Sequence, residues 1–195
     1  IWLDVPNSAG KEAKKGFSRI RTAEARRIAD QLNIWIKSSE GTNLSFGVIT
    51  FYKAQVSEVF RELERFGVSE KYPDGTWHIS EQYSHFQNGG ERIRIGTIDS
   101  FQGMEFDITF LSMVRTQAPE RLISWIEKES DYEKVKIGVF GHLMSKNRLC
   151  VSMSRQKRAL IVVGDGSLIQ SKISIDAVPE LYNYYLLCLD QGLVY

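Results

Sequence analysis

The chain has 195 residues, 43% hydrophobic and 25% charged, a balance typical of a folded globular protein with enough length for one α/β domain. Its formal net charge of +1 excludes a strongly basic or acidic protein, so any surface for nucleic acid has to be local. The two cysteines match neither a disulfide framework nor zinc-ligand spacing with the three histidines, and no apolar run is long enough to span a membrane.

These features favour an intracellular, cytoplasmic protein with no membrane partner. Cys150 lies in an apolar run and is expected to be a core residue rather than a reactive thiol. The chain begins with Ile1 instead of Met, and we therefore expect it to be a fragment of a longer protein.

In chain order, residues 1–6 predict a short strand ended by Pro6, and residues 7–20 predict a polar, lysine-bearing loop. Residues 22–39 have apolar side chains at helical spacing, with Thr22 as the expected N-cap. Residues 44–52 read as a buried strand, and residues 53–67 as an amphipathic helix ended by Gly67. Residues 68–90 are irregular, with an aromatic-rich part that either packs as a loop or stacks on bases.

The second half predicts strands at residues 92–98, 108–114 and 158–165. Between them lie an insertion at 117–137 with a short helix and a helix at 147–157, and a last helix covers 178–192. Strands that alternate with helices and are apolar on both faces indicate an α/β fold with a mostly parallel sheet covered on both sides. We therefore expect a single domain over residues 1–195.

Polar segments lie at or beside the ends of four of these strands. They are TFYKAQ, TIDSFQGMEFD, VRT and the segment before ALIVV. In open α/β sheets, ligands bind where loops converge at the carboxyl ends of the strands. Residues 141–160 add five Lys or Arg residues and no Asp or Glu, a local positive field suited to phosphate. Each segment alone is also compatible with an ordinary turn or a solvated helix face.

Taken together, the segments GVITFYKAQV, TIDSFQGMEFDITFLSMVRT and NRLCVSMSRQKRALIVVGD resemble motifs IV, V and VI of superfamily 1 helicases. The branch they resemble most includes the nonsense-mediated-decay RNA helicase and related DNA helicases. With the first strand and the helix start at Ser18–Ala25, the resemblance covers nearly the whole chain.

This resemblance implies the second RecA-like domain of a helicase motor, which binds ATP and Mg²⁺ in a cleft shared with the N-terminal RecA-like domain of the same protein. Single-stranded DNA or RNA would be the track, that is, the nucleic acid along which the motor moves. The chain contains no G-x-x-x-x-G-K-[ST] phosphate loop, so the magnesium ligands are expected in the other domain and the fragment alone is expected to be inactive.

The resemblance also implies roles for individual residues. Arg155 lies where the family has its arginine finger. An arginine suits that role because its planar guanidinium can hold phosphate oxygens and stays charged. Lys157 stands where the family often has a second Arg, and Arg148 matches a basic position that could equally form an ion pair within the domain.

The same resemblance places Gln102, Gly103 and Glu105 at the nucleotide, with Glu105 meeting the ribose and Gly103 letting the backbone approach phosphates. Thr50 and Thr97 match threonines that contact nucleic-acid phosphates, although each could simply be a β-branched strand residue.

One departure concerns motif IV. Val56 follows Gln55 where this branch often has Arg, so the cleft would work with one finger or with compensation from another residue such as Lys53. The alternative interpretation is a catalytically inactive helicase-like module that binds nucleic acid or has a regulatory role. A nuclease or methyltransferase is less well supported, because the sequence has no acidic metal cluster or Gly-rich cofactor loop.

Overall fold

The computed structural model describes residues 1–195 and is built around one parallel sheet of five strands in the order β1-β9-β8-β4-β7. Every neighbouring pair in this sheet is parallel, which confirms the predicted α/β class. The strands are β1 (Trp2–Asp4), β4 (Phe46–Thr50), β7 (Ile93–Thr97), β8 (Phe106–Ser112) and β9 (Gln156–Gly164).

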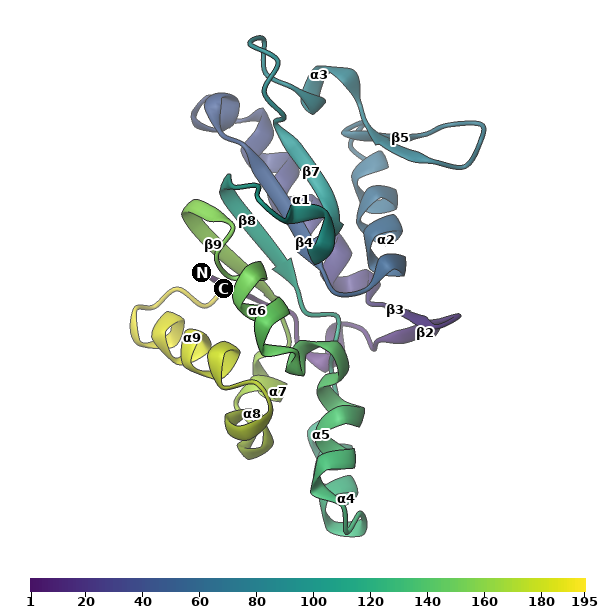
Figure 1. Ribbon diagram of the computed structural model, residues 1–195, viewed down its shortest axis with the longest axis vertical. Helices are drawn as coiled ribbons and strands as arrows, with labels where there is room; N and C mark the ends of the chain where they lie inside the picture. Colours follow the sequence, from purple (N-terminus) through teal and green to yellow (C-terminus); the bar gives the residue numbers. More distant parts are fainter.

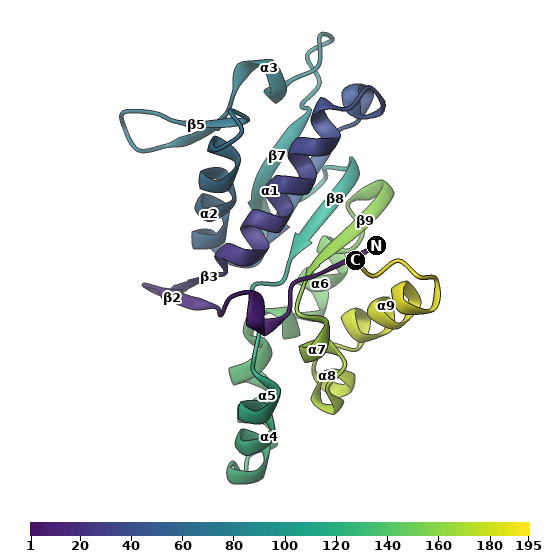
Figure 2. The ribbon, with the colours of Figure 1, turned by 180° about the vertical axis from the view of Figure 1, so that it is seen from behind.

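Helices cover both faces of the sheet (Figures 1 and 2). One face carries α1 (Thr22–Lys37) and α2 (Lys53–Glu64), and the other faces α6 (Lys146–Ser152) and α9 (Pro179–Asp190). Neighbouring strand residues alternate between the two apolar cores. Val48 and Phe110 join the core beneath α1 and α2, whereas Ile49 and Leu111 join the other. This alternation explains why the strands are apolar throughout, as the sequence indicated.

Shorter elements surround this framework, and none of the helices is long and apolar enough to cross a membrane. Two antiparallel hairpins, β2–β3 and β5–β6, stand apart from the main sheet. The α4–α5 pair projects beyond the sheet (Figure 1). The elements are β2 (Ala13–Lys15), β3 (Ser18–Ile20), β5 (Ser69–Lys71), β6 (Trp77–Ile79), α3 (Glu81–Ser84), α4 (Pro119–Lys128), α5 (Tyr132–Phe140), α7 (Gly166–Ile169) and α8 (Lys172–Ala177), with 3-10 turns η1 (Asn7–Ala9), η2 (Glu40–Asn43), η3 (Ile98–Phe101) and η4 (Gly141–Met144).

Several local expectations were wrong. Residues 7–20 are not only a loop, because they contain the β2–β3 hairpin, and Arg21 rather than Thr22 is the N-cap residue of α1. The helix expected at 147–157 ends at Ser152, so Arg155 lies in a turn. Cys150 is exposed instead of buried, because α6 turns Leu149 and Ser152 inward.

The last residues of the chain pair with the first strand. The Trp2 amide donates to the Leu193 carbonyl at 2.9 Å, the Tyr195 amide donates to the Trp2 carbonyl at 3.0 Å, and the Asp4 amide donates to the Tyr195 carbonyl at 2.7 Å. The direction of this pairing is parallel, and the two ends of the chain lie side by side in both views. β1 is therefore held between β9 and the C-terminal residues.

Candidate functional site

Arg155 lies in the turn between α6 and β9, at the amino-terminal edge of the sheet. Its Nε donates to the Val151 carbonyl at 3.1 Å, and its Nη2 donates to the Ser154 hydroxyl at 3.0 Å. Nη1 makes a longer contact, 3.4 Å, with the Met104 carbonyl. The half-buried guanidinium forms no salt bridge, so its charge is not neutralised within the chain.

The loop of residues 102–105 lies beside Arg155 because the first residues of β8 and β9 are adjacent. The Phe106 amide donates to the Arg155 carbonyl at 2.9 Å, which joins the loop to the turn. Gln102, Gly103 and Glu105 are exposed. Gly103 has φ +75°, a left-handed conformation that favours glycine, and a Cβ there would meet nothing within 4 Å. The structure therefore brings Glu105 and Arg155 to one rim.

Two further cations were predicted for the site, and Arg148 lies near the first residue of α6, at the end of that helix away from Arg155. Arg148 donates from Nη2 to Asp99 at 2.6 Å, while its buried Nε has no hydrogen-bond partner. Lys157 is exposed at the start of β9. The neighbouring Gln156 has a buried Oε1 that is also without a partner. Arg155 and Lys157 thus leave positive charge at the rim without a carboxylate partner, whereas the unpaired atoms of Arg148 and Gln156 are buried.

Asp107 fixes the strand starts next to the rim. It accepts hydrogen bonds from the Ser45 amide at 2.9 Å and the Ser45 hydroxyl at 2.8 Å, and it pairs with Arg158 at 3.2 Å. Burial raises the pKa of Asp107, but the two Ser45 hydrogen bonds and the positive charges of Arg158 and Lys157 outweigh burial and hold the pKa below its usual value. Asp107 is therefore ionised at neutral pH and anchors β8.

The two predicted threonines lie at the opposite, carboxyl-terminal edge of the sheet. Thr50 and Thr97 are directly paired at the ends of β4 and β7. The Thr50 side chain is buried, and its hydroxyl accepts from the Tyr52 amide at 3.3 Å. Thr97 is half-exposed. The four polar segments thus do lie at strand ends, but they are divided between the two edges of the sheet.

The motif IV glutamine is buried inside the domain. Gln55 accepts from the Arg21 amide at 2.8 Å and donates to the Arg21 carbonyl at 3.2 Å and to the Ser112 hydroxyl at 3.1 Å. Lys53 is exposed and Val56 is half-buried on the same helix. Gln55 thus ties the start of α1 to α2 and β8.

Sequence analysis missed a buried ion pair beside Gln55. Glu24 accepts from Arg21 at 3.0 Å, from the Ser112 hydroxyl at 2.7 Å and from the Val114 amide at 2.8 Å. Burial raises the pKa of Glu24, against the opposing effects of Arg21 and these hydrogen bonds. Val114 has φ +67°, which is rare for a β-branched residue. The only sequence signal was the Glu-Ala pair within the helix-start segment Ser18–Ala25. The network holds the backbone bend that follows β8.

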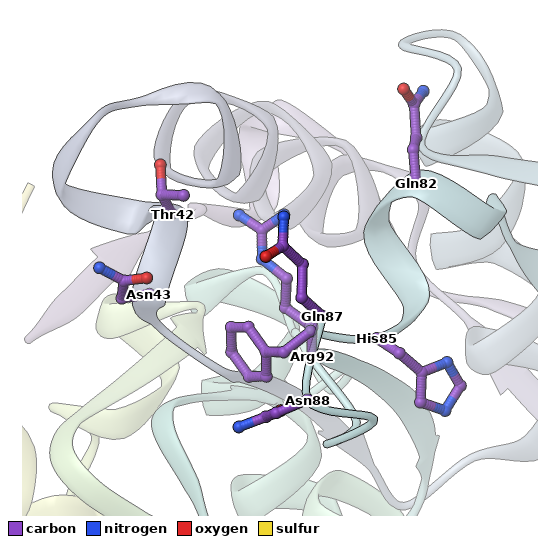
Figure 3. Close-up of a pocket in the computed structure, with 8 residues that line it drawn as sticks. Thr42, Asn43, Gln82, His85, Gln87, Asn88 and Arg92 are labelled. Atoms are coloured by element: carbon purple, nitrogen blue, oxygen red, sulfur yellow. The ribbon is translucent and has the colours of Figure 1, made fainter.

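A separate hollow of about 560 Å³ lies beside the amino-terminal ends of β4 and β7, and none of the predicted site residues lines it. Figure 3 shows Arg92 between the Thr42–Asn43 segment and Gln87. Burial lowers the pKa of Arg92, but its Nη2 donates to the Ile36 and Gly41 carbonyls at 3.0 and 3.2 Å. Arg92 is thus engaged in holding the end of α1, where a cation is favourable.

Comparison with known proteins gives a family match over most of the chain. The family model described as "AAA domain" matches residues 1–167. Among curated proteins, the chain is 28% identical over 175 residues to "Helicase required for RNAi-mediated heterochromatin assembly 1" of Schizosaccharomyces pombe, covering 88% of this chain and 14% of that protein. It is 30% identical over 174 residues to "DNA polymerase alpha-associated DNA helicase A" of Saccharomyces cerevisiae, covering 87% of this chain and 20% of that protein.

A shorter match, 27% identical over 124 residues, is to "5'-3' DNA helicase ZGRF1" of Mus musculus and covers 64% of this chain and 5% of that protein. The chain therefore spans a fifth or less of the length of these relatives. Among solved structures, the C-terminal domain of a possible DNA helicase from Lactobacillus plantarum WCFS1 aligns with TM-score 0.45 and 14% identity, over 92% of this chain and 81% of that one.

Proposed function

The chain belongs to the AAA domain family of superfamily 1 helicases, and on that premise we propose that it is the second RecA-like domain of an ATP-dependent nucleic-acid helicase or translocase. One observation carries the proposal. Arg155 presents a half-exposed guanidinium, without a carboxylate partner, on the same rim as the exposed Glu105. A cation left uncompensated at an ordered strand start is suited to an anionic ligand.

The chemistry of the rim fits a nucleoside triphosphate. Bound ATP supplies the γ-phosphoryl group whose transfer to water releases free energy. Arg155 offers a planar fork of donors that stays protonated, so it can offset the negative charge that develops on phosphate oxygens. The exposed Lys157 adds a second charged donor, and the carboxylate of Glu105 can accept from ribose hydroxyls.

The remaining parts of the ATP site belong to a partner domain in this proposal. The sequence has no phosphate loop, so the N-terminal RecA-like domain of the same protein would cradle the phosphates and hold Mg²⁺. Arg155 would then complete a cleft between two domains.

Single-stranded DNA or RNA would lie along the carboxyl-terminal edge of the sheet. Thr97 is the better exposed of the two threonines there, whereas the Thr50 hydroxyl is engaged with the Tyr52 amide. Residues 98–105 lead from Thr97 back to Glu105 at the other edge. A displacement of this segment would therefore couple the nucleotide rim to the track.

The test is Arg155→Ala in the full-length protein. We expect nucleic-acid-stimulated ATP hydrolysis to fall by about 10³-fold or more, as for arginine fingers in related enzymes, with a much smaller effect on nucleic-acid affinity. Arg65→Ala is the matched control, because Arg65 is a 51% exposed arginine that pairs with Glu62 of α2, away from the rim. Equal turnover in the Arg155 and Arg65 variants would refute the finger assignment.

One feature favours a second candidate function, a helicase-like module that binds nucleic acid without hydrolysing ATP. Val56 occupies the position where relatives of this branch often place a second arginine, so the chain brings one fewer cation to the cleft. Nucleic-acid binding by the full-length protein without any stimulated ATP hydrolysis would select this alternative.

A further inference from the structure

A hollow of about 400 Å³ lies at the carboxyl-terminal end of β8, between the β2–β3 hairpin and the start of α4. We call it the hairpin pocket. Figure 2 shows the hairpin above the α4–α5 pair on the same side of the molecule. The charged residues that line it are Lys11, Glu12, Lys14, Arg19, Arg115 and Arg121.

The lining of the hairpin pocket carries more net positive charge than the whole chain. Five cations and one carboxylate give the lining a formal charge of +4, whereas the whole chain has +1. Glu12 pairs with Arg19 and Arg115. Lys11, Lys14 and Arg121 take part in no salt bridge, so their charge remains available. Such a concentration of positive charge attracts phosphate.

The base of the pocket is held in place by hydrogen bonds and ion pairs. Arg115 is almost fully buried, and its Nε donates to Glu12 at 2.8 Å while its Nη2 donates to the Gly138 carbonyl. The Thr116 amide also donates to Glu12, at 3.2 Å. These contacts tie the hairpin, the end of β8 and α5 to one another. The exposed cations are therefore presented on an ordered support.

One wall carries an aromatic side chain. Trp125 of α4 lines the pocket and is half-buried, with its ring packed so closely on Gly138 that a Cβ there would lie 2.2 Å from it. Cations that follow a phosphate backbone, combined with an aromatic ring that can stack on a base, are the features of non-specific single-strand binding.

The hairpin pocket also continues the edge that carries the two threonines. Thr50 is paired with Ser112 of β8 and with Thr97 of β7, and Arg115 follows Ser112 by three residues. A single strand of nucleic acid that lies along the carboxyl ends of β7, β4 and β8 would thus reach the hairpin pocket next. We propose that the hairpin pocket binds backbone phosphates of single-stranded nucleic acid, with α4 forming its outer wall. This inference rests on the proposed function.

The test is the double variant Lys14→Glu with Arg121→Glu in the full-length protein. Both side chains are exposed and unpaired, so the fold is expected to be retained, which circular dichroism and thermal unfolding check. The matched control is Lys37→Glu with Lys172→Glu, which makes the same charge change at exposed positions on α1 and α8. Affinity for labelled oligo(dT) and oligo(U) of about fifteen nucleotides is measured at several salt concentrations.

We expect the pocket variant to lose about tenfold or more in affinity, and its salt dependence to flatten by about 1.4 logarithmic units per decade, as for two lost phosphate contacts on a single strand. The control variant is expected to keep the unaltered slope.

Pocket and control variants that bind alike would overturn the hairpin-pocket proposal alone. Inorganic phosphate that binds the unaltered protein but not the pocket variant, with oligonucleotide affinity unchanged, would assign the pocket to a free anion and also overturn it. Failure of the unaltered protein to bind either oligonucleotide would instead refute the proposed function from which the inference starts.

Discussion

Asp107 illustrates how single residues position the candidate rim. Its carboxylate receives two hydrogen bonds from Ser45 and pairs with Arg158, so it connects the segment before β4 with the first residues of β8 and β9. The loop of residues 102–105 comes before Asp107 in the chain, separated from it only by Phe106. The placement of Glu105 relative to Arg155 therefore depends on a charge that contacts neither residue.

Replacing Asp107 by Asn should destabilise the fold at neutral pH by about 1–2 kcal/mol, because hydrogen bonds to a charged acceptor become hydrogen bonds to a neutral one. The pKa of Asp107 is lowered in the folded state, so the stability it provides is present above the ordinary carboxyl value of 3.8 and is lost as the pH falls through the folded-state pKa. Urea unfolding at a series of pH values should show the two proteins converging below that range.

Asp190→Asn is the control for this experiment, since Asp190 is exposed at the end of α9 and has no ion-pair partner. A constant difference between Asp107→Asn and the unaltered protein across the acid range would show that ionisation of Asp107 is not the source of the effect.

Residue patterns in the sequence predicted which side chains are chemically notable but not what they contact. Arg155 and Arg21 are both arginines near a helix end, yet Arg155 is half-exposed and Arg21 is wholly buried against Glu24. Gln55 likewise belongs to a helicase-like motif but serves a buried network. Burial and partner choice depend on contacts between residues distant in the sequence, which spacing alone does not encode.

At the scale of elements, the segment that contains η3 and the 102–105 loop lies against the sheet through two aromatic rings. Phe101 and Phe106 are buried and meet edge to face with ring centroids 5.6 Å apart. Both rings lie over Gly47 in β4. The loop can reach the rim because Gly47 has no side chain to lift it from the sheet.

A methyl group at Gly47 would lie 2.9 Å from Phe101 Cε1 and 3.1 Å from Phe106 Cδ2. We therefore expect Gly47→Ala to lower the free energy of unfolding by about 1–3 kcal/mol, as for other overpacked cores. Combining it with Phe101→Leu should cost less than the sum of the two single changes, because the smaller side chain leaves room for the methyl group. Additive losses in urea unfolding would argue against the proposed contact.

Long, strongly periodic elements were predictable and short ones were not. The helices α1 and α2 and the central strands could be predicted because each buries side chains against the core. This burial gives their apolar residues a regular spacing that is visible in the sequence. The β2–β3 hairpin has strands of three residues without a buried side chain, so no period could reveal it. Its position, next to α4 and above Arg115, is nevertheless what creates the hairpin pocket.

At the scale of the whole molecule, the parallel sheet separates two sets of candidate residues. Arg155, Glu105 and their neighbours lie at the amino-terminal ends of strands, while Thr97 and the hairpin pocket lie at the carboxyl-terminal ends. The strands between them are five to nine residues long and buried on both faces. Such a body transmits displacement between its edges without deforming.

The isolated 195-residue chain should therefore fold but show no ATP hydrolysis, because the sequence supplies a candidate finger without a phosphate loop. Phosphate release in the presence of Mg²⁺ and oligonucleotide checks this, with the full-length protein as the positive control. Hydrolysis by the isolated chain at the rate of the full-length protein would refute the division of the ATP site between two domains.

The pairing of the C-terminal residues with β1 has a mechanical consequence. Because the two segments run parallel, tension between the ends of the chain pulls β1 backward and residues 193–195 forward. The hydrogen bonds of Trp2, Asp4 and Tyr195 are then loaded together in shear, and they would have to break at once instead of peeling open singly. Because β1 also pairs with β9, a load applied at the two ends is shared between these hydrogen bonds and the edge of the sheet.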